Sequence, residues 1–208
     1  MLQFEEKIKE WSGECVKFKG TKYYYHMPIL GENRYLHRIY NPLKEDRLDQ
    51  NIQNYLSDAH PDLVNLWKFC NGINLFMGYI YIFGFQQENF NDDGPKNIVY
   101  CTNNNLIKMY NENIDVLNIQ FCGGYASGNA LIYLRDKRDK FYLISMKDYK
   151  PLQVFDTLEE FIDYYIEIEQ GYRDENGLRK KNVGYDAVLR PKDIEFQKQF
   201  PSIEALIG

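Results

Sequence analysis

The sequence lacks the features that direct a protein to a membrane or to an oxidising compartment. None of its apolar runs approaches the ~20 residues needed to span a bilayer. The opening MLQFEEKIKE has no continuous apolar segment of the kind that a secretion signal contains. The four cysteines lie far apart among apolar neighbours and form no CxxC pair, which favours reduced thiols packed as small core residues. We therefore expect a soluble cytoplasmic protein with no membrane partner.

An excess of basic residues is also missing. The 208 residues carry a formal net charge of −5, whereas phosphate binding needs clustered Lys and Arg. Nucleic acid is thus not an expected partner, and a protein with a basic surface is favoured instead. The three histidines, His26, His37 and His60, are isolated, and none lies near a cysteine at metal-ligand spacing. We predict a structural role for each histidine and no metal site.

Apolar and aromatic residues are plentiful. Hydrophobic residues make up 44% of the chain, enough for a real core, and 18 tyrosines dominate its aromatic content. Tyrosine combines contact area with a polar tip, so this excess suggests strand-rich structure and an adhesive surface. The length fits one compact domain with extensions, and we find no internal repeat and no low-complexity segment.

Helical periodicity is clearest at two places. The stripe from Leu63 to Cys70 follows Pro61 and ends at Asn71-Gly72, which tolerates the left-handed backbone of a helix C-cap. A capping box, Thr157-Leu158-Glu159-Glu160, begins the second clear helix. Weaker signals predict further helices around 4–11, from Asn41-Pro42 to Leu56, at 103–111 and at 191–200.

Strand signals fill much of the remaining chain. Segments 15–19 and 23–27 surround Gly20, and segment 73–84 is a strand, or a hairpin pivoting at Gly78, buried on both faces. Alternation over 117–121 indicates a half-buried strand, and three further signals at 130–134, 141–146 and 152–155 predict an antiparallel meander. Together the elements predict an α+β fold with a largely antiparallel, about six-stranded sheet and flanking helices.

The glycine-rich stretch Gly123–Gly128 has the composition of a phosphate-binding loop. Such a loop needs a Lys-Ser/Thr pair or a helix N-terminus after its glycines. Here a strand pattern, Asn129–Tyr133, follows, and no lysine occurs before Lys137. We therefore interpret the stretch as a turn or bulge between two strands. Tyr125 at the tip of this bend is expected to reach toward a partner protein.

Cys122 stands next to two glycines, as a catalytic cysteine beside an oxyanion pocket would. A catalytic cysteine needs a histidine base and an orienting group, and the sequence has no local signature for either. A core cysteine at a strand end is the favoured reading, so we expect neither an enzyme nor a cofactor. An enzyme that uses Cys122 or a pair of carboxylates stays open as an alternative.

Acidic residues fall into two groups, each of which could form a negative patch that attracts a cationic partner. The first group surrounds the helix that starts at Thr157, with only Arg173 to oppose it: Asp156, Glu159, Glu160, Asp163, Glu167, Glu169, Asp174 and Glu175. The second group lies in and near loops, and with Tyr125 it makes up the predicted partner-binding residues: Glu88, Asp92, Asp93, Glu112 and Asp115. Taken singly, each carboxylate is more simply a solvated surface residue.

The order of these motifs resembles the SUKH superfamily. Segment 61–72, a proline-led helix ending in Asn-Gly, precedes aromatic strands in 75–84 that close with glycine. Segment 119–134 is similar to the family's strand, glycine-serine-glycine turn and next strand, although Gly123-Gly124-Tyr125-Ala126 stands where a shorter loop is common. Segment 154–162 resembles its closing Leu-Glu-Glu-Phe helix.

The resemblance covers about residues 42–170. It leaves residues 1–41 as an N-terminal helix and strands packing on the core, and 171–208 as a C-terminal extension. It implies an α+β domain with a largely antiparallel sheet flanked by helices. The family includes bacterial immunity proteins that neutralise polymorphic toxins, many of them nucleases, and a fungal regulator of cell-wall assembly. Its pattern establishes no catalytic residues.

The leading hypothesis is therefore a non-catalytic cytoplasmic immunity protein. Its partner would be a cognate toxin domain with a basic surface, a nuclease being the favoured kind. The alternative is an intracellular protein-interaction module for signalling or cell-envelope regulation.

Overall fold

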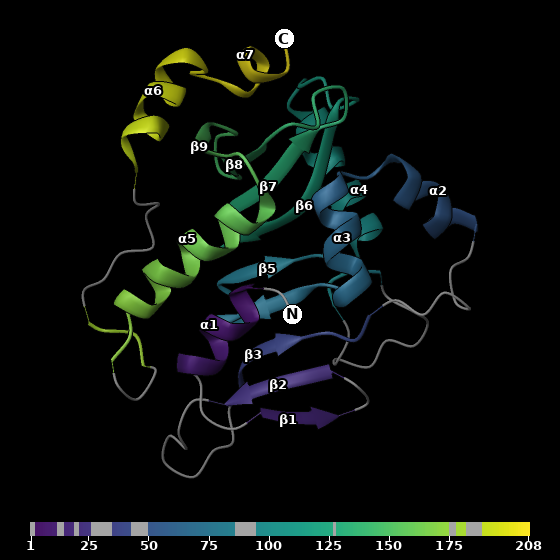
Figure 1. Cartoon of the computed structure of the whole chain (residues 1–208). Coiled ribbons are helices and arrows are strands. Elements are labelled where there is room, and N and C mark those ends of the chain that lie inside the picture. The colour runs from purple at the N-terminus through teal and green to yellow at the C-terminus, as the bar shows by residue number, and fades with distance from the viewer. Residues whose placement is uncertain are drawn as a thin grey trace.

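A computed structural model shows an α+β protein built on one antiparallel sheet with helices around it (Figure 1), which confirms the predicted fold class. The structure describes residues 3–11, 15–18, 21–25, 35–42, 50–85, 95–126, 128–174, 178–181 and 189–208. Among these residues, no helix has the length and apolarity needed to cross a membrane.

The helices in the described part of the chain are α1 (Gln3–Trp11), α2 (Gln50–Asp58), α3 (Pro61–Phe69), the short 3-10 helix η2 (Phe76–Gly78), α4 (Ile98–Asn111), α5 (Leu158–Gly171), α6 (Pro191–Gln199) and α7 (Ile203–Ile207). The strands are β1 (Cys15–Phe18), β2 (Thr21–Tyr25), β3 (Tyr35–Ile39), β4 (Ile73–Leu75), β5 (Ile80–Ile82), β6 (Ile119–Tyr125), β7 (Asn129–Leu134), β8 (Phe141–Ser145) and β9 (Pro151–Phe155).

The sheet is a meander in which each strand pairs antiparallel with the next one along the chain, from β1 to β9. Nine strands are present among the described residues, so the prediction of about six is too low for the whole sheet. Six of them, β4 to β9, lie within residues 42–170. The other three extend the same sheet, because Arg38 and Ile39 of β3 pair with Asn74 and Ile73 of β4.

Strand β3 escaped prediction because one of its inward positions is polar. His37 is fully buried, and its Nδ1 accepts a 3.2 Å hydrogen bond from the backbone N–H of Phe76. A buried polar group is tolerated when it is hydrogen-bonded. Because a histidine takes this inward position, the segment lacks the apolar alternation that a strand normally shows.

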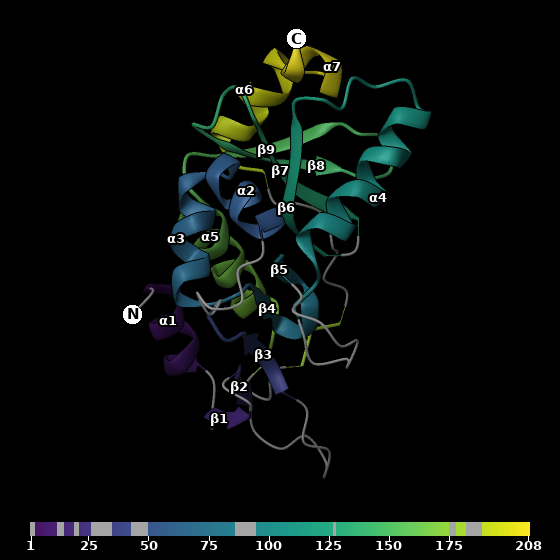
Figure 2. The ribbon, with the colours of Figure 1, turned by 90° about the vertical axis from the view of Figure 1, so that its right-hand side faces the viewer.

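Helices cover both faces of the sheet. Figure 2 shows α1, α3 and α5 on one side and α4 on the other. Phe155 of β9 packs edge-on against Phe161 of α5, with ring centroids 5.3 Å apart. On the same side, Asp62 near the start of α3 accepts a 3.0 Å hydrogen bond from the N–H of Leu158, the first residue of α5. The side chain of Thr157 caps α5 as predicted, accepting from the N–H of Glu160 at 3.0 Å.

The C-terminal segment covers the edge strand β9. The Arg190 side chain donates a 2.6 Å hydrogen bond to the carbonyl of Val154, and Asp193 of α6 accepts from the N–H of the same residue at 3.2 Å. Both backbone polar groups of Val154 are therefore satisfied by side chains rather than by another strand. An open edge invites pairing with a further chain, so α6 protects this end of the sheet.

The glycine-rich stretch differs from its predicted shape. Strand β6 continues through Gly123 and Gly124, with a bulge between Phe121 and Gly123, and the chain turns only after Tyr125. A Cβ on Gly123 would lie 2.3 Å from the carbonyl oxygen of Tyr81 on β5. These glycines therefore serve the close approach of two strands. The predicted bulge in the connection of two strands is present, but the bend begins after Tyr125 and not at Gly123.

The observed bounds of several other elements differ from the predicted ones. Segment 73–84 is the hairpin of β4 and β5, turning through η2, where Gly78 has a φ of 96° that favours glycine. Helix α4 is longer than the predicted 103–111, and α7 was not predicted. Asn41 and Pro42 are not helical, and α2 occupies Gln50–Asp58 in the described part of the chain.

Candidate functional site

The predicted partner-binding residues do not form one cluster in the described structure. Glu88, Asp92 and Asp93 lie outside the described residues. Glu112 and Asp115 are exposed in the segment that follows α4. Tyr125 is fully buried, so the prediction that it reaches out to a partner is wrong.

Tyr125 points into the core from the last position of β6. Its hydroxyl donates a 2.8 Å hydrogen bond to Oε1 of Glu169, and its ring stacks on Tyr165 of α5 with centroids 3.8 Å apart. Burial, followed by the Glu169 carboxylate, raises the pKa of the Tyr125 hydroxyl. This tyrosine stabilises the junction between β6 and α5.

Much of the acidic group around α5 is neutralised by basic residues, most of which lie outside this helix. Glu169 is fully buried and lies 3.1 Å from Arg173 and 3.4 Å from Arg179. Asp163 forms a 3.0 Å ion pair with Lys7 of α1. Further ion pairs among the described residues are Glu160 with Arg190 and Lys192, Asp156 with Lys140 and Lys192, and Glu167 with Lys7. This side of the molecule therefore carries less uncompensated negative charge than the sequence suggests.

Helix α4 presents an apolar surface to solvent. Tyr100 is 68% exposed, Ile107 59% and Tyr110 70%, and their spacing of seven and then three residues places them on one side of the helix. Leu117, in the segment after the helix, is 82% exposed. We call these four residues the α4 stripe.

The opposite side of α4 faces the sheet. Ile98, Thr102 and Met109 are buried there, and the Thr102 hydroxyl donates a 3.2 Å hydrogen bond to the carbonyl of Phe121 on β6. The helix thus carries large apolar side chains on both sides, but only one side is covered by the described residues. An exposed apolar patch beside polar residues is typical of a protein-interaction surface.

Two carboxylates lie beside the α4 stripe. Glu112 caps the C-terminus of α4, and Asp115 accepts a 3.1 Å hydrogen bond from the N–H of Leu117, which fixes the loop that carries that side chain. No described residue forms an ion pair with either carboxylate. The partial negative charge at the C-terminal end of the helix adds to theirs.

The cysteines differ in their exposure to solvent. Cys122 is fully buried, its thiol donates to the carbonyl of Leu131 at 3.3 Å, and burial raises its pKa well above the ordinary value. The interpretation of Cys122 as a core residue is confirmed. Cys15 is exposed, so the expectation that every cysteine packs among apolar neighbours is wrong for that one.

Two histidines have structural partners. His60 is buried and caps α3, since its Nδ1 accepts a 3.1 Å hydrogen bond from the N–H of Asp62, and His37 is held by Phe76 as described above. His26 lies outside the described residues. Within the described ranges, no three or more His, Cys, Asp and Glu side chains come together in a group able to hold a metal ion.

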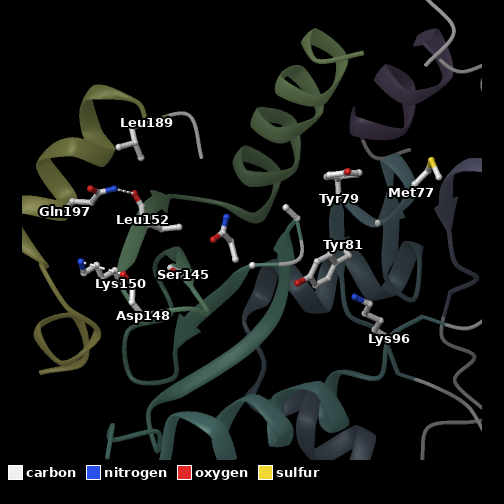
Figure 3. A pocket seen from close by; sticks show the side chains of 14 residues that line it. Met77, Tyr79, Tyr81, Lys96, Ser145, Asp148, Lys150, Leu152, Leu189 and Gln197 are labelled. Carbon is white, nitrogen blue, oxygen red and sulfur yellow. Dashed lines mark hydrogen bonds and ion pairs between the residues drawn. The ribbon is translucent and has the colours of Figure 1, made fainter. Parts of the chain in front are cut away.

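A cleft of about 1000 Å³ opens where three turns of the meander meet α6 (Figure 3). The turns are those between β4 and β5, β6 and β7, and β8 and β9. On one side, the ammonium of Lys96 lies 4.1 Å from the centre of the Tyr81 ring. On the other, Lys150 lies 3.6 Å from Asp148, whose pKa is lowered first by a hydrogen bond from Ser145 and further by Lys150.

Neither surface is evident from local sequence patterns. Tyr100, Ile107 and Tyr110 recur at helical spacing, but Met109 and Ile98 read as equally apolar, so the pattern does not tell which side is exposed. The cleft joins turns whose residues are as far apart in the chain as Tyr81 and Lys150, and no local motif marks such a junction. Comparison with known proteins adds no relative: no family model, no curated protein and no solved structure matches the chain.

Proposed function

We propose that the chain is a SUKH-like immunity protein that binds and neutralises a toxin domain through the α4 stripe, without catalysis. The observation that carries this proposal is the exposure of Tyr100, Ile107, Tyr110 and Leu117 beside Glu112 and Asp115, two exposed carboxylates with no ion-pair partner among the described residues.

The stripe has the composition of an interface centre. Tyrosines are enriched among the residues that contribute most to binding, because they bury a large rigid area and keep a polar tip. Fully burying one large apolar side chain contributes about 1.5–3 kcal/mol, so a few such contacts supply the core of a stable complex. Tyr110 lies at the centre of the stripe in sequence, between Ile107 and Leu117.

The adjoining charges favour a basic partner. Glu112, Asp115 and the C-terminal end of α4 together attract Lys or Arg side chains and would speed encounter with them. Nucleases hold phosphate with basic surfaces, so a nuclease toxin has the complementary charge. The chain's net charge of −5 acts in the same direction.

The fold supports the family assignment without establishing it. The helix from Pro61, the β4–β5 hairpin, the β6–β9 meander and the capped α5 occur in the order that the SUKH resemblance requires. Because the buried thiol of Cys122 has no access to a substrate, binding is also a simpler account than turnover.

The test is binding to any toxin domain that a neighbouring gene encodes, measured by calorimetry together with inhibition of that toxin. Tyr110→Ala and Glu112→Lys should each weaken binding by about tenfold or more, and added salt should weaken the wild-type complex. Phe69→Ala on α3 and Glu204→Lys on α7 are matched controls, since both residues are exposed and lie outside the stripe.

Two results would count against the proposal. Full inhibition by the stripe variants would move the interface elsewhere on the molecule. A neighbouring gene that encodes no toxin, with no inhibition of any tested nuclease, would favour the interaction module for signalling or cell-envelope regulation.

A further inference from the structure

The three turns that build the cleft contain residues with an unusual backbone conformation. Met77 (φ 61), Ala126 (φ 53) and Tyr149 (φ 54) are left-handed, one in each of the three turns that build the cleft. A non-glycine residue in this conformation costs about 1–2 kcal/mol. Of the other described non-glycine residues with positive φ, Phe76 belongs to the first of these turns and Asn113 lies after α4. Such strain persists where the surrounding structure imposes a shape, and it recurs at binding sites.

The cleft is basic on an otherwise acidic chain. Its described charged lining residues are Lys96, Lys150 and Asp148. No described carboxylate lies within ion-pair distance of Lys96, whose ammonium rests on the Tyr81 ring, while Lys150 contacts Asp148 at 3.6 Å. Figure 3 shows the two lysines at opposite sides of the hollow. A ligand with anionic groups at both ends would meet both ammonium groups.

The size of the cleft exceeds that of a simple anion. A volume of about 1000 Å³ lies at the upper end of the range for small-molecule pockets. The lining also offers the aliphatic side chains of Leu152 and Leu189, whereas the rings of Tyr79 and Tyr81 already lie against Arg179 and Lys96. The occupant should therefore combine carboxylates with apolar side chains over an extended length.

We propose that this cleft binds an acidic peptide segment. Its carboxylates would pair with Lys96 and Lys150, and its apolar side chains would lie on Leu152 and Leu189. This site is separate from the α4 stripe, and the proposal does not depend on the identity of any toxin.

Gly128 supplies a way to block the cleft without disturbing the fold. A Cβ at Gly128 would meet no atom within 4 Å, and its φ is not left-handed, so neither packing nor backbone requires glycine there. It lines the cleft all the same. Gly171, at the end of α5, has the same two properties and does not line the cleft. Gly128→Trp should fill the cleft, and Gly171→Trp is its matched control.

The experiment selects random dodecapeptides displayed on phage against the full chain, with counter-selection on Gly128→Trp. Enriched peptides are then synthesised with a fluorophore, and their binding is measured by fluorescence anisotropy. We expect sequences rich in Asp and Glu with aromatic or aliphatic residues between them. Gly128→Trp and Lys96→Glu should each weaken binding by about tenfold or more, whereas Gly171→Trp and Lys198→Glu should leave it nearly unchanged.

Each alternative outcome is informative. No enrichment over the counter-selected variant, enrichment of peptides without acidic residues, or equal binding to Gly128→Trp would overturn the proposal. Thermal melting of Gly128→Trp at the wild-type temperature excludes unfolding as the cause of lost binding. Free glutamate and inorganic phosphate are tested as competitors of the labelled peptide. If either displaces it at the same concentration as unlabelled peptide does, the cleft binds a small anion instead.

Discussion

The hydroxyl of Tyr125 donates a 2.8 Å hydrogen bond to Oε1 of Glu169, joining the last residue of β6 to the last turn of α5. Both side chains are fully buried. Arg173 and Arg179 also contact the Glu169 carboxylate, and Arg173 reaches the carbonyl of Phe76 in the turn between β4 and β5. A buried charge is costly unless it is paired and hydrogen-bonded, so these contacts act as one unit that fixes two turns of the sheet to α5.

The first prediction tests that unit with Tyr125→Phe. The substitution keeps the ring that stacks on Tyr165 and removes only the hydrogen bond to a buried carboxylate. We expect the free energy of unfolding to fall by about 1.5–3 kcal/mol, measured by urea denaturation. Tyr100→Phe is the control, since Tyr100 is 68% exposed, and it should change stability by less than about 0.5 kcal/mol. Equal effects of the two substitutions would contradict a stabilising role for the Tyr125–Glu169 bond.

The second prediction concerns two glycines of the stretch Gly123–Gly128, of which one leaves no room for a side chain and the other does. In Gly123→Ala the new Cβ would lie 2.3 Å from the carbonyl oxygen of Tyr81, so strands β5 and β6 must separate. A loss of about 3 kcal/mol is expected from such overpacking. Gly128→Ala meets no atom and should leave stability unchanged or raise it by about 0.4–1 kcal/mol. Thermal and urea unfolding of both variants would reveal the order, and the reverse order would show that the close approach of β5 and β6 does not require glycine.

Elements defined by local signals were the most predictable. An apolar stripe predicted the helix that starts at Pro61, and a capping box predicted the helix after Thr157. The spacing of the apolar segments predicted strands β7 to β9. These features depend on residues a few positions apart, so periodicity and capping chemistry identify them. The α+β class followed from them.

Features that depend on distant partners were not predictable. Nothing near Tyr125 in the sequence shows that Glu169 accepts its hydroxyl, and nothing near Asp163 points to Lys7 of α1. From the sequence, a tyrosine in a glycine-rich stretch and a run of carboxylates are both expected at the surface. In the structure, tertiary contacts bury Tyr125, and ion pairs neutralise much of the acidic group. The side of α4 that is exposed likewise depends on where β6 lies.

The third prediction separates the cysteines by access. Cys15 is exposed, whereas Cys70 and Cys122 are buried, and burial raises the pKa of Cys70 to about 12 and that of Cys122 well above its ordinary value. Because the thiolate is the reactive form, iodoacetamide at about pH 8 should label Cys15 quickly and the two buried thiols only when the protein opens.

Peptide mass spectrometry over a time course measures each site. Cys15→Ser should remove the fast reaction, and Cys122→Ser should leave it intact. Labelling of Cys122 as fast as that of Cys15 in the native protein would contradict the buried position and would revive the alternative of an enzyme that uses this thiol.

The fourth prediction is a pH dependence that originates at His60. Its ring packs against both Tyr133 and Phe141, with centroids 5.5 and 4.2 Å away. Its Nδ1 must be unprotonated to accept from the N–H of Asp62. Burial lowers the pKa of His60 in the folded protein, although the carboxylate of Asp62 acts in the opposite direction.

The unfolded chain therefore binds this proton at a higher pH than the folded protein does. The stability that neutral His60 contributes is fully present above the unfolded pKa of about 6.5 and is lost as the pH falls through the folded value. Asn caps helices as well as any residue and does not titrate, so in His60→Asn this loss should disappear. Urea unfolding between about pH 7.5 and pH 5 should show a shallower decline for the variant than for wild type. Parallel curves would mean that His60 does not titrate in this window and that other groups cause the acid sensitivity.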